Sequence, residues 1–135
     1  MTGKKPQEGT NLSPGNLHEP GDCRAISEVL SRVGDKWTVL VVETLGGESK
    51  RFSELRRALG SISQRMLTLT LRALERDGLV TRTVFPTVPP RVDYALTELG
   101  RSLLDPVNAL SLWARKNRPS IEDARKRFDS ADAQR

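Results

Sequence analysis

The sequence is poor in the residues that build disulfides, metal sites and catalytic centres. It has one cysteine, Cys23, which excludes an intrachain disulfide, and one histidine, His18, which we expect to be solvated in a Pro/Gly-rich segment. One residue of each kind is too few for a structural zinc site. The chain also has no clustered Cys/His/Asp set, no glycine-rich phosphate loop and no serine-elbow motif. We therefore predict no metal, no cofactor and no enzyme activity.

Aromatic residues and long apolar runs are also scarce. Aromatics make up 4% of the 135 residues, so the core must consist of Leu, Val, Ile and Ala. No apolar run approaches the roughly 18–20 residues that span a membrane, and the polar N-terminus lacks the apolar region of a signal peptide. We expect one domain of ordinary size with tails, no membrane partner and a cytoplasmic location.

The net charge of +5 is unevenly distributed along the chain. Residues 50–91 carry nine basic and three acidic side chains, whereas residues 22–49 carry three and five, and residues 92–135 carry eight and seven. A basic excess confined to one segment is typical of a surface that contacts nucleic acid. A solvated basic surface without a partner is the alternative. The helix-turn-helix pattern in the same segment, described below, favours contact with nucleic acid.

The N-terminal part of the chain predicts an arm and two helices. Residues 1–21 contain Gly, Pro, Ser, Asn and Thr without apolar periodicity, which indicates a disordered arm. Apolar residues at i, i+3, i+4 and i+7 then predict an amphipathic helix over Cys23–Val33. Asp35 can cap a second helix, Lys36–Leu45, which is apolar on most sides and suits the centre of the fold.

The stretch Arg51–Arg76 has the layout of a helix-turn-helix, a motif that places side chains in the DNA major groove. Ser53 is expected to cap a short helix that runs to Leu59. After a four-residue turn, Ser63 is expected to cap a longer helix that runs to about Asp77.

Beyond this motif the periodicity changes from helical to alternating. Leu79–Phe85 and Val92–Leu96 are rich in β-branched residues and enclose a proline-rich loop, which predicts a β-hairpin, the wing of a winged helix. Thr97 can cap a final helix, which Pro106 should kink or split in two. Residues 118–135 are charged and weakly apolar, and we expect a tail that can extend as a helix but is dispensable to the core.

The longer helix of the motif has one apolar face and one polar face. Leu67, Leu71 and Leu74 fall within about 40° of one another on a helical wheel and predict the buried side. Gln64 and Arg65 occupy the first turn, from which a recognition helix usually reaches base edges. Arg can bond guanine O6 and N7 as a fork, and Gln can do the same to adenine. The outward side also carries Thr68, Leu69, Arg72 and Arg76.

Two groups on this outward side leave alternatives open. Leu69 is large and apolar, and either it contacts thymine methyl groups or the helix is rotated and Leu69 packs on a neighbour. Arg72 and Arg76 either contact DNA or form an ordinary charged face with Glu75 and Asp77 as partners.

Basic residues also flank the motif. Lys50, Arg51, Arg56 and Arg57 surround its first helix, where phosphate contacts that position the protein without specifying sequence are expected. Arg91 follows the prolines of the wing and either reaches the adjacent minor groove or backbone, or is a solvated loop charge.

Several segments together resemble one family. RFSELRRAL, ISQRMLTLTLRALERDGLVTRTVFPTVPPRVDYALTELG and the later PVNALSLW are similar to HxlR-type winged helix-turn-helix regulators, relatives of the MarR group. The resemblance covers Cys23–Asn117 and implies a mainly α (α+β) fold, with a two-stranded wing and flanking N- and C-terminal dimerisation helices. The domain would then span residues 22–117, and residues 118–135 would form the tail.

The resemblance also implies a bacterial homodimer that binds a near-palindromic operator and regulates transcription. Dimers of the family join through the first and last helices, here through Ile26, Leu30, Leu103, Leu110 and Trp113. Cys23 corresponds to a cysteine that some members use as a thiol switch, and a structural cysteine is the alternative. Members carry polar residues where this chain has Leu69 and Thr70, so base specificity cannot be transferred at Leu69.

The expected function is therefore sequence-specific transcriptional regulation, with double-stranded DNA and a second copy of the chain as partners. A winged-helix module for protein contact or non-specific DNA binding is the alternative, and no small-molecule effector can be named. The expected DNA-contacting residues are Lys50, Arg51, Ser63, Gln64, Arg65, Thr68, Leu69, Arg72 and Arg91.

Overall fold

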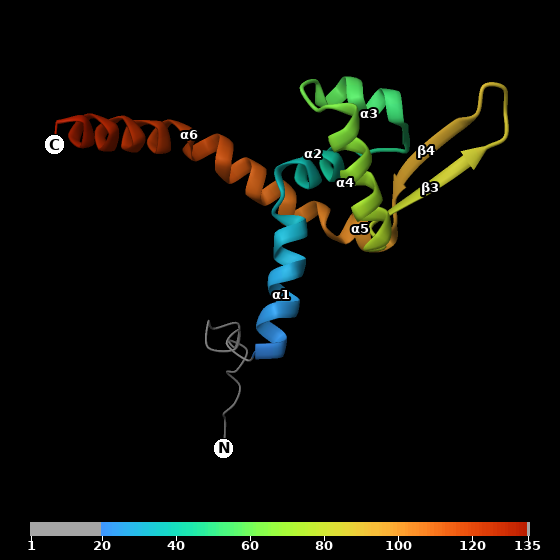
Figure 1. Ribbon diagram of the computed structural model, residues 1–135, viewed down its shortest axis with the longest axis horizontal. Helices are drawn as coiled ribbons and strands as arrows, with labels where there is room; N and C mark the ends of the chain where they lie inside the picture. Colours follow the sequence, from blue (N-terminus) through green and yellow to red (C-terminus); the bar gives the residue numbers. More distant parts are fainter. Residues whose placement is uncertain (1–19, 135) are drawn as a thin grey trace, which may run out of the picture. The chain divides into compact units, whose positions relative to one another are not determined.

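The computed structural model describes residues 20–134, which fall into two compact units that divide between Val39 and Leu40 (Figure 1). The predicted arm over residues 1–21, including His18, lies outside the described residues except for its last two positions, which belong to the first helix.

The first unit contains helix α1, Pro20–Val33, and the start of helix α2, Lys36–Thr44. Helix α1 begins before the predicted Cys23, because the Pro/Gly pair at its start is tolerated in a first helical turn. Between the helices, the Asp35 carboxylate accepts hydrogen bonds from the backbone N–H groups of Trp37 at 3.1 Å and Thr38 at 3.2 Å. The predicted cap of the second helix is thereby confirmed.

The second unit combines helices with a small antiparallel sheet. After the end of α2 come β2 (Lys50–Arg51), α3 (Phe52–Leu59), α4 (Gln64–Arg76), β3 (Val80–Phe85), β4 (Arg91–Leu96), α5 (Glu98–Ser102) and α6 (Leu104–Ala133). The strand order is β2-β4-β3. Strands β3 and β4 form a hairpin that extends beyond the helices of this unit (Figure 1).

Leucine and valine side chains make the core of this unit, as the shortage of aromatics requires. The largest fully buried side chains on α3 and α4 are Leu55, Leu67, Leu71 and Leu74. Ile62 in the turn between the two helices is buried as well. Because both helices and their turn contribute to one apolar cluster, packing fixes the geometry of the helix-turn-helix.

Strand β2 is an element that the sequence pattern does not predict. It pairs with β4 in the register Lys50↔Tyr94 and Arg51↔Asp93, so the segment before α3 belongs to the sheet. The predicted capping by Ser53 is wrong, because α3 begins at Phe52 and Arg51 is the residue before it. The Arg51 backbone N–H instead donates to Glu54 Oε1 at 2.8 Å.

Thr97 holds the two ends of the hairpin together. Its hydroxyl donates to the Gly78 carbonyl at 2.6 Å, and its backbone N–H donates to the Leu79 carbonyl at 3.0 Å. The same hydroxyl accepts the Gly100 N–H at 3.0 Å, so the predicted cap of α5 is confirmed. One residue thus connects the end of α4, the start of β3 and the start of α5.

The C-terminal helical region is split, as Pro106 predicts. Helix α5 ends at Ser102 and α6 begins at Leu104, which places Pro106 in the first turn of α6, where a missing N–H removes no hydrogen bond. Helix α6 continues for 30 residues through the predicted tail, with Pro119 in its interior. Figure 1 shows α6 bent along its length, as an internal proline requires. Within residues 20–134, no helix is long and apolar enough to cross a membrane.

Candidate nucleic-acid interface

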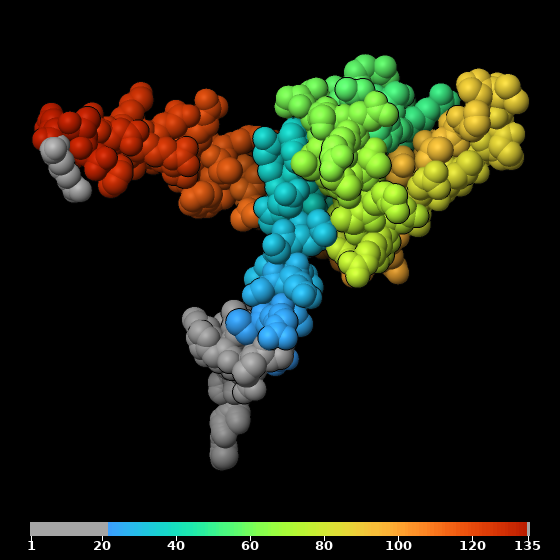
Figure 2. All heavy atoms as spheres, in the orientation of Figure 1, coloured from blue at the N-terminus to red at the C-terminus, as the bar shows by residue number. Residues whose placement is uncertain are grey.

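Helix α4 has the orientation that its sequence predicts. Leu67, Leu71 and Leu74 are buried, whereas Leu69 is 49% exposed. A rotated helix with Leu69 packed on a neighbour within the chain is therefore wrong. Figure 2 shows atoms of α4, in light green, at the surface of the second unit. The other outward side chains, all exposed, are Gln64, Arg65, Met66, Thr68, Arg72 and Arg76.

The start of α4 is held by Ser63. Its hydroxyl accepts the Met66 backbone N–H at 3.0 Å, which satisfies one of the free donors of the first turn. This bond fixes the backbone from which Gln64 and Arg65 project. Ser63, predicted as a DNA contact, therefore has a structural role as the cap of the helix.

Replacing Ser63 with alanine is expected to lower the free energy of unfolding by about 1 kcal/mol, because the first turn loses its side-chain acceptor. Urea denaturation followed by circular dichroism measures this change. Ser61→Ala, at an exposed position of the same turn, is the matched control and should stay within about 0.5 kcal/mol of the wild type. Equal losses in the two variants would contradict the capping role.

The basic residues before α3 occupy two different environments. Lys50 is half-buried, with its Nζ 3.6 Å from Glu48 Oε2. The Arg51 side chain is exposed, while its backbone is fixed by the sheet and by Glu54. The Arg51 N–H lowers the pKa of the Glu54 carboxyl below its usual value, and the charges of Arg51, Lys50 and Arg57 add to this effect. Glu54 is thus ionised at neutral pH and keeps its bond to the backbone.

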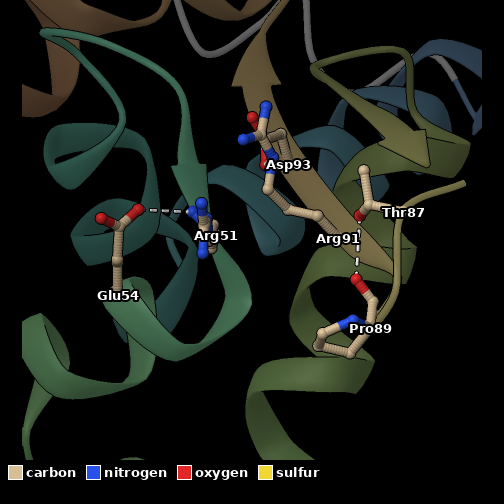
Figure 3. A network of polar contacts seen from close by, with 6 residues as sticks. All are labelled: Arg51, Glu54, Thr87, Pro89, Arg91 and Asp93. Atoms are coloured by element: carbon tan, nitrogen blue, oxygen red, sulfur yellow. Dashed lines mark hydrogen bonds and ion pairs between the residues drawn. The ribbon is translucent and has the colours of Figure 1, made fainter. Parts of the chain in front are cut away.

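Arg91 has two partners within the hairpin. Its guanidinium lies over the Phe85 ring, 4.4 Å from the centroid, and its Nε is 3.2 Å from Asp93 Oδ1. Phe85 pairs with Arg91 across the hairpin, so the ring contact joins the two strands near the tip. Asp93 lies on the same strand as Arg91, two residues further on (Figure 3). The alternative of a solvated loop charge does not fit these contacts, which stabilise the wing. The contact of Arg91 with the minor groove or the DNA backbone stays a prediction.

A concave surface lies between the start of α3 and the tip of the hairpin. Residues 51–53 line one side and residues 87–92 the other, around a hollow of about 570 Å³. The loop beside it is ordered by the Thr87 hydroxyl, which donates to the Pro89 carbonyl at 2.8 Å (Figure 3). The exposed side chain of Arg51 and the wing thus border the same hollow.

Three arginines form a basic stripe along the outer face of α4, which we call the arginine stripe: Arg65, Arg72 and Arg76. Their spacing of seven and four residues keeps them within about 40° of one another around the helix axis. A capped helix with an exposed basic face, preceded by a short helix and followed by a β-hairpin, defines a winged helix-turn-helix protein.

Comparison with known proteins identifies the family. Residues 32–122 match the model of the HxlR-like helix-turn-helix family, and the chain belongs to this family. It is 44% identical over 110 residues to the Escherichia coli (strain K12) protein named uncharacterized HTH-type transcriptional regulator YtfH, covering 82% of this chain and 86% of YtfH. The family and its members are transcriptional regulators, not enzymes.

Solved structures agree with this assignment. The putative transcriptional regulator ytfH from Salmonella typhimurium superposes with a TM-score of 0.70 and 43% identity, covering 74% of this chain and 89% of that one. The redox regulator HypR in its reduced form gives a TM-score of 0.68 and 43% identity, covering 73% and 98%. Its oxidized form gives a TM-score of 0.64 and 44% identity, covering 69% and 96%.

The remaining predicted site residues lie on α1 and near the start of α6. On α1, Ile26 and Leu30 are exposed and Cys23 is half-buried with a free thiol. Leu103, between α5 and α6, is half-buried, whereas Leu110 and Trp113 on α6 are exposed. Met66 is an outward residue of α4 that was not among the predicted site residues, although its spacing of three from Leu69 indicates a shared face.

Proposed function

We propose that this protein is a sequence-specific, DNA-binding transcriptional regulator that acts as a homodimer on a near-palindromic operator. The observation that carries the proposal is the outer face of α4. It is exposed, it is basic, and it projects from a helix whose start is fixed by a side-chain cap. Such a helix fits the B-DNA major groove.

The residues of α4, of the segment before α3 and of the wing have different roles in DNA binding. Gln64 and Arg65 in the first turn read base edges through paired hydrogen bonds, and Thr68 adds a contact one turn later. Lys50, Arg51 and Arg72 contact phosphates, which set position and affinity without sequence information. Arg91 acts through the wing, because its guanidinium is held against Phe85 and Asp93.

The homodimer proposal is supported by exposed apolar side chains on two helices. Helix α1 exposes Ile26 and Leu30, and α6 exposes Leu110 and Trp113. Large apolar side chains that cluster on a surface mark interaction sites. A two-fold dimer formed by these helices, together with Leu103, would present two copies of α4 to successive major grooves.

Selection of bound fragments from genomic DNA tests the proposal against the alternative of a protein-contact or non-specific module. We expect enrichment of a site with two related halves, centred about 10 base pairs or a multiple of this apart. Salt dependence alone cannot separate the two functions, because phosphate contacts dominate both. Recovery of fragments without any shared sequence would contradict the proposal.

A redox response at Cys23 is a second candidate function. It is favoured by the 43–44% identity to the redox regulator HypR and by the free thiol of Cys23 on α1. In a homodimer, two such thiols can form an intersubunit disulfide while diamide takes up the two electrons and two protons. A purely structural cysteine is the alternative.

Diamide treatment is expected to change the affinity of the wild type for its operator at least severalfold and to leave the Cys23→Ser variant unchanged. Gel-shift titrations before and after treatment measure the change, and dithiothreitol should reverse it. The chain has one cysteine, so the variant is a complete thiol-free control. An equal response of both proteins would rule out the thiol switch.

A further inference from the structure

Two apolar side chains are exposed at one edge of the basic outer face of α4. Met66 is 40% exposed and Leu69 is 49% exposed, although every other leucine of this helix is buried. We call this pair the Met66–Leu69 patch. Exposed apolar surface on an otherwise basic face calls for a partner that is apolar at the contact and negatively charged around it.

The geometry of the helix places the patch directly beside the arginine stripe. Met66 and Leu69 are one turn apart, and Leu69 lies about 40° from Arg65 and about 60° from Arg72 around the helix axis. The Ser63 cap bonds to the backbone of Met66 itself. The patch therefore begins in the capped first turn of α4, next to side chains that carry positive charge.

We propose that the Met66–Leu69 patch is a binding site for the 5-methyl groups of thymines in the DNA major groove. This inference rests on the DNA-binding function proposed above and names a base that the arginine and glutamine of α4 do not select. In the major groove only thymine presents an apolar group, its C5 methyl, while the other groups on the base edges are donors and acceptors.

Charge identifies DNA as the occupant of the patch. The walls of the major groove are phosphates, which match Arg65 one turn before Leu69 and Arg72 one turn after it. A protein partner would need an interface of about 800 Å² on each side, with few charges at its centre. On α4 the arginines instead directly border Leu69, with Met66 beyond it, which fits a contact of the size of a methyl group.

The proposed methyl contact defines where a thymine should lie in the operator. Because Leu69 lies beside Arg65 on the helix surface, the thymine that it contacts should be in a base pair next to the one that Arg65 reads. Contact with the methyl group buries one apolar group, which raises the affinity about fourfold per half-site. The patch and the first turn of α4 would thus read neighbouring positions by different chemistry.

The experiment uses the selected operator with thymines replaced by deoxyuridine, which removes the methyl group and leaves base pairing intact. Affinities of the full-length protein are measured by fluorescence anisotropy for each position within the half-sites. We expect one or two positions at which uracil weakens binding by about fourfold per half-site. Leu69→Ala should bind the thymine operator more weakly and lose this sensitivity.

Arg72→Ala is the matched control on the same face. It should bind both operators more weakly and keep the full thymine-to-uracil difference, since it removes a phosphate contact and not a methyl contact. Thermal melting of each variant excludes unfolding. Equal affinity of the wild type for both operators at every position, or unchanged sensitivity in Leu69→Ala, would overturn the inference while leaving DNA binding intact. Failure to select any operator would overturn the proposed function and the inference together.

Discussion

Arg65→Ala is expected to lose most of its preference for the operator over unrelated DNA. Arg65 is exposed in the first turn of α4, where an arginine can bond guanine O6 and N7 at once. Losing these two hydrogen bonds costs about 1–3 kcal/mol of binding free energy per half-site, which is roughly 5- to 150-fold in affinity. Anisotropy titrations with operators that vary at one base pair measure both affinity and preference.

Arg72, a second member of the arginine stripe, provides the control for Arg65→Ala. Arg72→Ala should weaken binding to all sequences by a similar factor and reduce the salt dependence of the binding constant by about one phosphate contact per half-site. Loss of sequence preference in Arg65→Ala but not in Arg72→Ala assigns base reading to the first turn. Unchanged affinity and unchanged preference in Arg65→Ala would count against α4 as the reading helix.

Gly100→Ala is expected to destabilise the second unit by about 1–3 kcal/mol, lowering the melting temperature by several degrees. A Cβ at this buried position would overlap the Leu79 carbonyl and crowd a methyl group of Leu96. The carbonyl cannot yield freely, because it accepts the Thr97 N–H at 3.0 Å. The clash outweighs the gain of up to about 1 kcal/mol that alanine brings to a helix.

Gly47→Ala is the matched control for this prediction, measured by the same thermal melts. Apart from Gly47 itself and its two chain neighbours, no described residue comes within 4 Å of a Cβ at this position, which is exposed. The melting temperature should be unchanged or slightly higher, because alanine restricts the unfolded chain. A similar loss in both variants would show that the contact at Gly100 is not the cause.

The elements with strong local signals could be predicted from the sequence. The spacing of Leu67, Leu71 and Leu74 gave the orientation of α4, and Ser63 and Thr97 marked helix starts that the structure confirms. Alternation around a proline-rich loop gave the hairpin β3–β4. The helix caps depend on side chains within a few residues of the helix start. The orientation of α4 and the strands depend on a periodicity that runs the length of each element.

Features that depend on distant residues could not be predicted. Strand β2 has two residues, too short for any period, and exists because β4 offers it backbone partners. Its pairing moves the start of α3 to Phe52 and makes Glu54, not Ser53, the residue that bonds the preceding backbone. Arg91 likewise depends on Phe85, which the hairpin register brings opposite it.

The helical extension that the sequence allows for the charged tail is present in α6. The segment after Pro119 is rich in charge and weakly apolar, and the helix continues through it to Ala133. Propensity explains the continuation, since Ala, Arg, Lys and Glu after Pro119 are good helix formers. The dispensability of this segment to the core stays a prediction.

The pairing of β2 with β4 fixes the separation between two expected DNA contacts, one before α3 and one at the wing. Lys50 and Arg51 are hydrogen-bonded to the strand that ends the wing, and α3 follows them without an intervening loop. In the proposed complex, Lys50 and Arg51 contact one set of phosphates and the wing contacts another. The distance between the two sets is then fixed by a sheet register and not by a flexible linker. Substitutions within the loop 86–90 can alter what the wing tip touches, while the number of base pairs covered by each half of the dimer stays constant.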